Sequence, residues 1–400
     1  MRKKILFVIN TMGRAGAELS FLNLLRKLEG ERYDLSLYVL MGQGEMIEEV
    51  PSYVRILNKG FRAESVLSKD GRKALMKTVL GAFIKNGKYI GKLCYIVKHF
   101  VIMMSKGRIQ IDKLLWRIIA EGAMKSDEHY DLAVAWLEGG AAYYVADRVE
   151  ADSKVAFIHI DYENAGYTRE MDQNCWERFN RIFAVSEDAK KKFLKIYPEY
   201  DDKMSVFHNI IDQEDIRRRA KESGGFSDDY DGMRILTVGR LTYQKAYDIT
   251  IEAMRILKDF GWRVRWYVLG EGDQRENLEK KIASLGLEND FLLLGSVENP
   301  YPYYEQADLY VHAVRFEGQG IAVWEAQTLG CAVIVSDYCG SREQIEDGKY
   351  GISCELTPES IAESISNLLN DEKRRINLGQ MAATKKMPEG QEKWLYELLE

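Results

Sequence analysis

Cysteine and proline are both scarce in this 400-residue chain, which contains five cysteines and six prolines. An odd number of cysteines without a CxxC pair argues against a disulfide framework or a zinc site and favours reduced thiols in the cytoplasm. The chain also has no Ser/Pro-, Gln- or Gly/Ser-rich tract, which excludes a low-complexity or linker-dominated protein. Its first apolar run, 5–9, is too short for a signal-peptide core, so we expect no secretion.

Apolar residues, in contrast, are abundant. The composition is 46% hydrophobic and 11% aromatic, with 30% charged residues. Such a chain buries a large core and is far from the composition of disordered proteins. At about 100 to 200 residues per domain, the length predicts two or three domains.

The net charge of −6 hides a basic segment. Residues 62–125 contain fourteen Lys or Arg and four acids, a local charge of +10, so the remainder of the chain carries −16. Such a segment indicates an anionic partner, which is a lipid surface, a phosphate-bearing substrate or nucleic acid, or else a solvated helix face. Because the segment has no recognisable nucleic-acid motif, we expect no nucleic-acid partner.

Residues 89–104 within this segment predict an amphipathic helix, because apolar side chains recur at three- and four-residue spacing. These are Tyr89, Ile90, Leu93, Val97, Phe100, Val101 and Met104, and we expect Lys85, Lys88, Lys92 and His99 largely on another face. The stretch is shorter than the roughly 20 residues that cross a bilayer. Two interpretations stay open: the helix lies on an anionic membrane surface, or its apolar stripe packs against the first sheet.

Short apolar runs alternate with helix-length segments almost from end to end, which is typical of βαβ units stacked into parallel sheets. The predicted fold class is α/β, with two doubly wound, Rossmann-like sheets. Strands are expected at 4–9, 35–41, 53–57, 132–136, 154–158, 182–185 and 204–207, and then at 233–238, 263–269, 290–294, 309–313, 332–335 and 351–353.

The polar stretch 212–231 lacks a sheet pattern and is predicted to be a linker. The first domain then spans 1–211, with a basic helical insertion at about 68–125, and the second spans 232–385. A final helix in 386–400 is expected to pack back on the first domain. Because open α/β sheets bind ligands at the carboxyl ends of their strands, we expect a cleft shared by the two domains.

Glycine turns follow the first strand of each predicted domain. Gly16 lies where the first strand passes into a helix, so that backbone N–H groups can approach an anion. In the second domain, Gly239, Arg240 and Lys245 follow the strand at 233–238. These two cations suit a diphosphate leaving group, and the alternative for each is a salt bridge to a neighbouring acid.

Two glutamates follow a later buried strand of the second domain. We expect Glu317 on a loop with Gly318 and Gly320, and Glu325 on the next helix, pointing into the cleft. Backbone N–H groups near Gly320 and Ile321 are expected to form an anion site at the start of that helix. A carboxylate beside such a site suits hydroxyl groups such as a ribose diol.

These motifs resemble those of the retaining glycosyltransferases of family four, which have the two-domain GT-B fold. The similarity rests on 238–245, 307–308, 317–325 and 336–348, and more loosely on 16–18, 184–187 and 209–212. It implies that a hexose-type sugar is moved from a nucleotide-sugar, a UDP-sugar before a GDP-sugar, with retained anomeric configuration and without a metal or other cofactor. The expected acceptor is a saccharide, lipid-linked, in cell-surface polysaccharide or glycolipid synthesis, with the enzyme cytoplasmic or peripheral on the inner face of the membrane.

The resemblance also implies roles for individual residues. By carry-over, Arg240 and Lys245 bind the donor diphosphate, Glu325 the ribose, Glu317 the donor sugar hydroxyls, and the amide of Gly16 the distal phosphate. His159 matches a histidine near the reacting sugar in such enzymes, and the alternative is a core or capping histidine.

The chain departs from the family pattern at three places. Ala15 stands where the family has a glycine, Ala246 stands where a glycine follows the diphosphate lysine, and Val314 replaces a serine. The DxD at 229–231 lies in the predicted linker, so we expect a solvated loop and no metal site. The alternative function is a catalytically inactive partner subunit that binds sugar nucleotides with the same fold.

Overall fold

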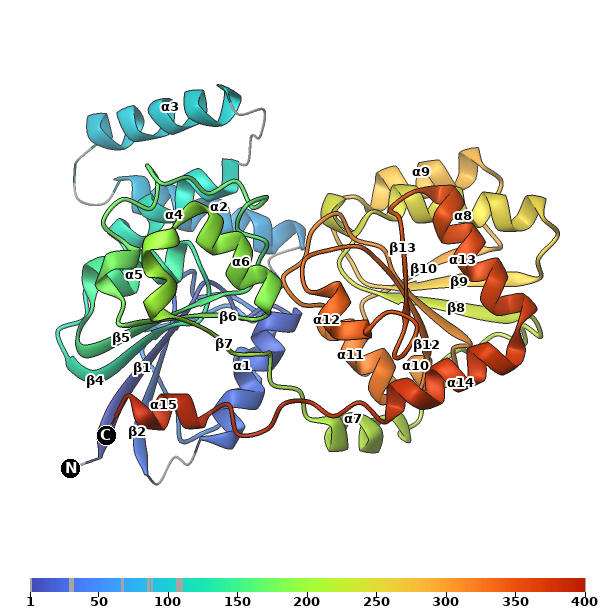
Figure 1. Ribbon diagram of the computed structural model, residues 1–400. Helices are drawn as coiled ribbons and strands as arrows, with labels where there is room; N and C mark the ends of the chain where they lie inside the picture. The colour runs from blue at the N-terminus through green and yellow to red at the C-terminus, as the bar shows by residue number, and fades with distance from the viewer. Residues whose placement is uncertain are drawn as a thin grey trace. The chain divides into compact units, whose positions relative to one another are not determined.

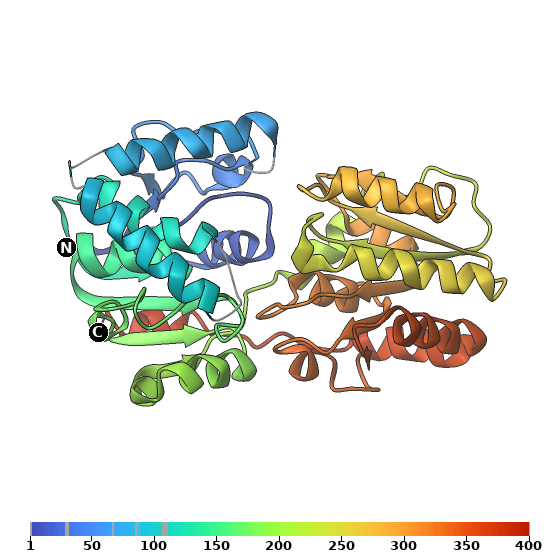
Figure 2. The ribbon, with the colours of Figure 1, turned by 90° about the horizontal axis from the view of Figure 1, so that it is seen from above.

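This computed structural model describes residues 2–28, 32–65, 68–84, 87, 89–105 and 111–399. The chain forms two compact units, one of Met1–Ile210 with Pro388–Glu400 and one of Ile211–Met387. Each unit is built on a parallel sheet with helices on its faces, and all thirteen predicted strands are present (Figures 1 and 2). The predicted fold class, two doubly wound α/β units, is confirmed.

The first unit contains a seven-stranded sheet in the order β3-β2-β1-β4-β5-β6-β7. Its strands are β1 (Lys3–Ile9), β2 (Tyr33–Val39), β3 (Arg55–Ile56), β4 (His129–Ala135), β5 (Glu150–Ile158), β6 (Arg181–Ala184) and β7 (Met204–Val206). Its helices are α1 (Gly16–Lys27), α2 (Lys69–Ile84), α3 (Tyr89–Ser105), α4 (Ile111–Gly122), α5 (Gly140–Arg148), α6 (Glu187–Ile196) and α15 (Lys393–Glu397). Strand β1 is central: Ile5 is in register with Leu35 of β2 and with Leu132 of β4.

The end of the chain belongs to the first unit. Leu395 of α15 is fully buried in the same core as β1, and Tyr396 stacks on Tyr33 with ring centroids 5.7 Å apart. The Gln391 side chain accepts the N–H of His208 at 2.6 Å and donates to its carbonyl at 3.1 Å. Apolar burial and a paired backbone group therefore hold the last residues on the first sheet.

The second unit contains a six-stranded sheet in the order β10-β9-β8-β11-β12-β13. Its strands are β8 (Met233–Val238), β9 (Val264–Leu269), β10 (Phe291–Gly295), β11 (Leu309–His312), β12 (Ala332–Ser336) and β13 (Ile352–Cys354). Its helices are α7 (Gln213–Ala220), α8 (Tyr247–Asp259), α9 (Arg275–Ser284), α10 (Tyr301–Gln306), α11 (Ile321–Thr328), α12 (Ser341–Ile345), α13 (Pro358–Asn370) and α14 (Glu372–Ala383). The buried apolar residues of β8, β9, β11 and β12 form its core.

Residues 212–231, predicted to be a linker, are instead part of the second unit. Asp212 caps α7 by accepting the N–H of Asp215 at 2.9 Å. The carboxylate of Asp228 forms ion pairs with Arg234 at 3.1 Å and Arg265 at 2.9 Å, on strands β8 and β9. The segment lacks an apolar pattern because its polar side chains cap a helix and neutralise strand cations. Asp229 and Asp231 of the DxD are exposed, as expected for a solvated loop.

Candidate functional site

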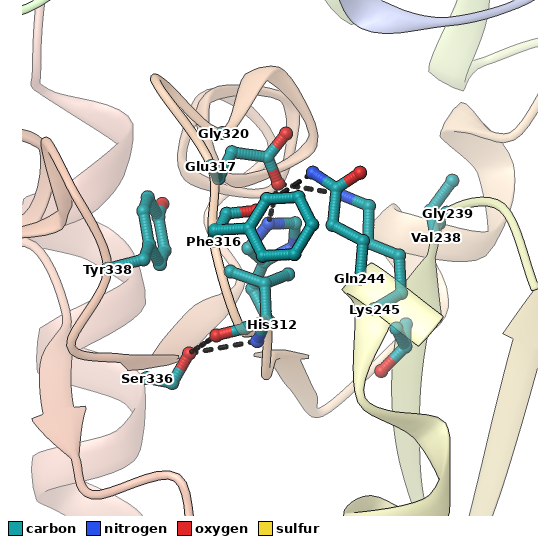
Figure 3. Close-up of polar contacts among 12 residues, drawn as sticks. Val238, Gly239, Gln244, Lys245, His312, Phe316, Glu317, Gly320, Ser336 and Tyr338 are labelled. Atoms are coloured by element: carbon teal, nitrogen blue, oxygen red, sulfur yellow. Dashed lines mark hydrogen bonds and ion pairs between the residues drawn. The ribbon is translucent and has the colours of Figure 1, made fainter. Parts of the chain in front are cut away.

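The strand order of the second unit reverses between β8 and β11. Such a switch point leaves a crevice at the carboxyl ends of the strands, where open α/β sheets bind their ligands. The loop after β8 carries Arg240 and Lys245, and the loop after β11 carries Glu317. Because β8 and β11 are parallel neighbours, the two loops leave the same edge of the sheet (Figure 3).

Polar contacts fix the two loops to each other. The backbone N–H of Arg315 donates to the carbonyl of Gln244 at 2.8 Å, and the Gln244 side chain donates to the carbonyl of Phe316 at 2.8 Å. The guanidinium of Arg315 also makes a two-pronged ion pair with Asp248 in the first turn of α8, at 3.0 and 2.7 Å. Glu317 is thereby held in one position at the edge of the sheet.

One oxygen of Glu317 receives two short polar contacts. Its Oε2 lies 2.6 Å from Nζ of Lys245 and 3.0 Å from Nε2 of His312 (Figure 3). Burial would raise the pKa of Glu317, but the Lys245 ammonium and the His312 hydrogen bond outweigh it and lower that pKa to about 2. Glu317 is therefore ionised at neutral pH and paired with Lys245. The alternative prediction for Lys245, a salt bridge to a neighbouring acid, therefore holds in the chain without ligand.

His312 is a site residue that the sequence analysis missed. It is 2% exposed, and burial together with the Lys245 charge lowers its pKa, so the ring is neutral. Since Nε2 faces a carboxylate, the ring proton is assigned to Nε2, and Nδ1 then accepts the Tyr310 hydroxyl at 3.1 Å. The only signal in the sequence is a polar residue within the apolar run 309–313.

Arg240 differs from Lys245 because its side chain is exposed. Its guanidinium makes no hydrogen bond or ion pair with the part of the chain that the structure describes. Gly239 precedes it, and a Cβ added there would make an ordinary van der Waals contact with the Lys245 side chain, at 3.4 Å. The guanidinium of Arg240 is therefore available to an anion, whereas the ammonium of Lys245 is shared with Glu317.

The conformation of Ala246 shows what its departure from the family pattern means for the backbone. Its backbone is left-handed, with φ of 48° and ψ of 31°, at the point where the turn after Lys245 enters α8. Glycine adopts this conformation without steric cost, whereas for a residue with a side chain the conformation is sterically unfavourable. The turn is kept with alanine, whose methyl group is fully buried in the core.

Glu325 lies on α11 as predicted, but its carboxylate faces α10. Tyr304 donates its hydroxyl to Oε2 at 2.9 Å, and Tyr301 donates to Oε1 at 3.3 Å. Burial raises the pKa of Glu325 to about 7, against these two hydrogen bonds. The expectation of a carboxylate pointing into an open cleft is not met, because the two tyrosines, which the sequence analysis missed, cover this group.

The start of α11 is closely packed. The N–H of Gly320 donates to Oε1 of Gln344 at 3.3 Å, and Tyr338 donates to the same oxygen at 2.8 Å. A Cβ added at Gly320 would lie 2.7 Å from the Tyr338 hydroxyl, so only glycine fits there. Gly318 is buried in the preceding loop and Ile321 is the first helical residue. The amide of Gly320 is thus satisfied within the chain, and an anion site at the start of α11 that uses the amide of Ile321 stays a prediction.

The first unit has its own switch point, between β1 and β4. Gly16 is the first residue of α1, directly after the turn that leaves β1. After β4, the carboxylate of Glu138 is buried, and Oε2 accepts the N–H of His159 at 2.9 Å. Burial raises the pKa of Glu138. The sequence analysis missed this acid, although its position before Gly139 at the end of a predicted strand is a usable signal.

His159 packs its ring against Trp136, with centroids 5.2 Å apart. Both ring nitrogens are buried without a hydrogen-bond partner among the described residues, and burial lowers the pKa of His159 to about 3. A buried polar atom without a partner costs about 1 to 3 kcal/mol, so a ligand that reached these nitrogens would gain affinity. Within the described ranges, no three His, Cys, Asp or Glu side chains lie closely enough together to hold a metal ion.

The sequence of this chain is similar to those of known proteins. Residues 220–385 match the family model described as glycosyl transferases group 1. The chain is 33% identical over 175 residues to the N-acetylgalactosamine-N,N'-diacetylbacillosaminyl-diphospho-undecaprenol 4-alpha-N-acetylgalactosaminyltransferase of Campylobacter jejuni, covering 43% of this chain and 46% of that protein. It is 22% identical over 396 residues to the poly(glycerol-phosphate) alpha-glucosyltransferase of Bacillus subtilis, covering 90% and 57%. The chain therefore spans about half the length of these relatives.

Solved structures resemble the whole chain. Anabaena HepE in complex with UDP and glucose superposes with a TM-score of 0.69 at 17% identity, covering 100% of this chain and 99% of that one. The Escherichia coli structure described as trehalose-6-phosphate bound with UDP-2-fluoro glucose superposes with a TM-score of 0.68 at 10% identity, covering 99% of each chain. These likenesses show the fold, which is the GT-B fold. The resemblance to the group 1 glycosyltransferases is confirmed by the family model for residues 220–385.

Proposed function

We propose that this protein transfers a hexose-type sugar from a UDP-sugar to a saccharide acceptor, because residues 220–385 match the model of the group 1 glycosyltransferases. One observation carries the proposal. Lys245 and Glu317, a cation and an ionised carboxylate 2.6 Å apart, lie at the switch point between β8 and β11. A diphosphate needs the first group, and sugar hydroxyls need the second.

We propose that Arg240 and Lys245 bind the donor diphosphate. The exposed guanidinium of Arg240 gives a first contact, and Lys245 then lies between Glu317 and a phosphate oxygen. Both cations stabilise the negative charge that develops as the diphosphate departs, which is usually the largest catalytic contribution. Since these fixed charges can take the place of a divalent cation, we expect a chelator to leave the rate unchanged, and we expect no cofactor.

Retention of the anomeric configuration is part of the proposal. The acceptor oxygen bonds to the anomeric carbon on the face from which the diphosphate leaves, and the acceptor proton passes to the departing phosphate oxygen. Glu317 is better suited to hold sugar hydroxyls than to act as a nucleophile, because its charge is neutralised by Lys245. Glu325 takes the ribose once its contacts with Tyr301 and Tyr304 rearrange.

We propose that the first unit binds the acceptor. His159 offers two unpartnered ring nitrogens beside Glu138, and the amide of Gly16 is expected on the distal phosphate. The Campylobacter relative is named for a diphospho-undecaprenol substrate and the Bacillus relative for a poly(glycerol-phosphate). We therefore infer a lipid-linked or polymeric acceptor in polysaccharide or glycolipid synthesis, with the protein peripheral on an anionic membrane.

The proposal is tested with four variants and a panel of UDP-sugars. We expect Lys245→Ala to lower UDP release in the presence of acceptor by roughly 100-fold or more, with weaker UDP binding. Lys245→Arg keeps the charge if the alanine variant folds poorly. Glu317→Gln should keep or strengthen UDP binding, because Lys245 loses its competing carboxylate, while transfer falls. Lys280→Ala, an exposed lysine of α9, is the matched control.

Wild-type turnover in a folded Lys245→Ala variant would remove the diphosphate role. The alternative function, a catalytically inactive partner subunit, predicts a different pattern. In that case UDP raises the melting temperature of the wild-type chain, but no donor and acceptor pair gives transfer.

A further inference from the structure

Helices α2 and α3 of the first unit expose an apolar face. Ile90 is 81% exposed, and seven further side chains are between 53 and 66% exposed: Met76, Leu80 and Ile84 of α2, and Leu93, Val97, Val101 and Met104 of α3. We call these eight residues the outer face. Soluble proteins rarely expose large contiguous apolar patches without a binding role. Figure 1 shows α3 outside α2 and α4, on the side away from the sheet of its unit.

Two polar residues of α3, Lys92 and His99, point inward. Lys92 is 4% exposed, and its Nζ donates to the carbonyls of Ala82 at 2.8 Å and Phe83 at 3.1 Å, at the end of α2. His99 is 3% exposed, with its ring 4.3 Å from that of Tyr95. Lys92 and His99 therefore lie on another face than the exposed apolar residues, as expected, and this face points inward. The ammonium of Lys92 neutralises the carbonyls at the end of α2.

This orientation decides between the two interpretations of the apolar stripe. The residues at three- and four-residue spacing do share one face of α3, but that face is exposed and does not pack on the first sheet. Lys85 and Lys88 lie outside the described residues. No helix in the described part of the chain combines the length and the apolar composition that crossing a membrane requires.

Exposed cations accompany the outer face. Arg72, Lys73 and Lys77 lie on α2 and Lys98 lies on α3, all exposed, within a segment that carries +10. We propose that α3 docks in the plane of an anionic lipid bilayer, with its apolar side chains at the acyl boundary and these cations among the headgroups. Anionic lipids complement both parts of the surface. A second copy of the chain complements the surface less well, because a symmetric pairing brings the same cations together.

The inference deepens the proposed function, since a lipid-linked acceptor is reached at a bilayer surface, but docking itself requires no sugar transfer. The proposed docking also defines the orientation of the first unit on the membrane. The side that carries α3 faces the lipid, and the cations of α2 lie beside it.

The chain contains its own reporter for this docking. Of the five cysteines, Cys94 is exposed on α3 and the other four are buried. We suggest labelling Cys94 with an environment-sensitive fluorophore and adding vesicles of phosphatidylglycerol with phosphatidylcholine, or of phosphatidylcholine alone. We expect a blue shift and stronger emission with the anionic vesicles, and sedimentation of the protein with them.

Two variants test the assignment to α3. The double variant Val97→Asp with Val101→Asp should partition roughly tenfold or more weakly, because two exposed apolar side chains are lost from the lipid contact. Since both side chains are exposed, the fold should not change. Phe260→Asp, at a 68% exposed residue of the second unit, is the matched control and should partition as the wild type does.

A label that stays in a water-like environment with anionic vesicles would overturn the proposal, as would equal partitioning of the double variant. An emission change that depends on protein concentration without vesicles, with a dimer in sedimentation velocity, would assign the outer face to a second copy instead. UDP binding measured on the same samples separates the two proposals. Vesicle docking without UDP binding leaves this inference standing and removes the proposed function.

Discussion

Glu325 gives the second unit a stability that depends on pH. Burial raises its pKa from the ordinary 4.5 to about 7. Between these values the folded chain keeps a proton that the unfolded chain has lost, so the free energy of unfolding falls as the pH rises. Each unit of pKa is worth about 1.4 kcal/mol, which gives a loss of about 3 kcal/mol between pH 4.5 and pH 7 or above. The Glu325→Gln variant does not titrate and should lack this slope.

A buried thiol beside the site makes the effect measurable locally. Sγ of Cys331 donates to the backbone carbonyl of Tyr304 at 2.9 Å, and the hydroxyl of the same tyrosine binds Glu325. The modification rate of Cys331 by a thiol reagent, followed by peptide mass spectrometry, reports opening of this region. Taking the ratio of wild type to Glu325→Gln at each pH cancels the intrinsic titration of the thiol.

We expect that ratio to rise by roughly 100-fold between pH 5 and pH 8, because Glu325 ionises in the opened state while the folded state keeps its proton; the rise levels off above the folded pKa. Parallel pH profiles in the two proteins would refute the reasoning, because another group would then control the opening. A variant that is less stable by the same amount at every pH would indicate that geometry, and not charge, decides the packing of α10 on α11.

Two further predictions concern the first unit. Asp172 accepts the hydroxyls of Tyr143, Tyr162 and Tyr197 at 2.6 to 2.7 Å. We expect Asp172→Leu to lower the free energy of unfolding by about 3 kcal/mol or more, against about 1 kcal/mol for Tyr143→Phe, in urea titrations followed by tryptophan fluorescence; equal midpoints would contradict this. Leu395→Ala should cost about 2 to 5 kcal/mol, because Leu395 is fully buried in the core of the first unit, and an unchanged melting temperature would show that the final segment is dispensable.

The sequence predicted the fold well because its signals are local. Buried parallel strands are short apolar runs, and each of the thirteen expected runs is a strand whose bounds differ by only a few residues. The prediction of a linker at 212–231 was wrong, because only local signals can be seen in the sequence. Its structure depends on ion pairs from Asp228 to Arg234 and Arg265, and no periodicity reports such distant pairs.

The site could be predicted only in part. Strand neighbours and motif spacing place Lys245 and Glu317 at one edge of the sheet, but their direct contact depends on the pairing of Arg315 with Asp248. Glu325 was placed on its helix correctly, whereas its covering tyrosines come from a helix that follows a different strand. In α3, periodicity gave the residues of each face, but which face points outward is decided by what the helix packs on.

The return of the chain to its starting unit has a consequence for how the protein is made. Leu395 and Leu399 complete a core that begins with Ile5, so the first unit cannot complete its core until residues 388–399 have been synthesised. The second unit, whose chain is continuous, can fold earlier. A fragment ending at residue 210 should therefore be unstable, and one that carries 388–400 through a short artificial connection should be the smallest version of the first unit that can be prepared alone.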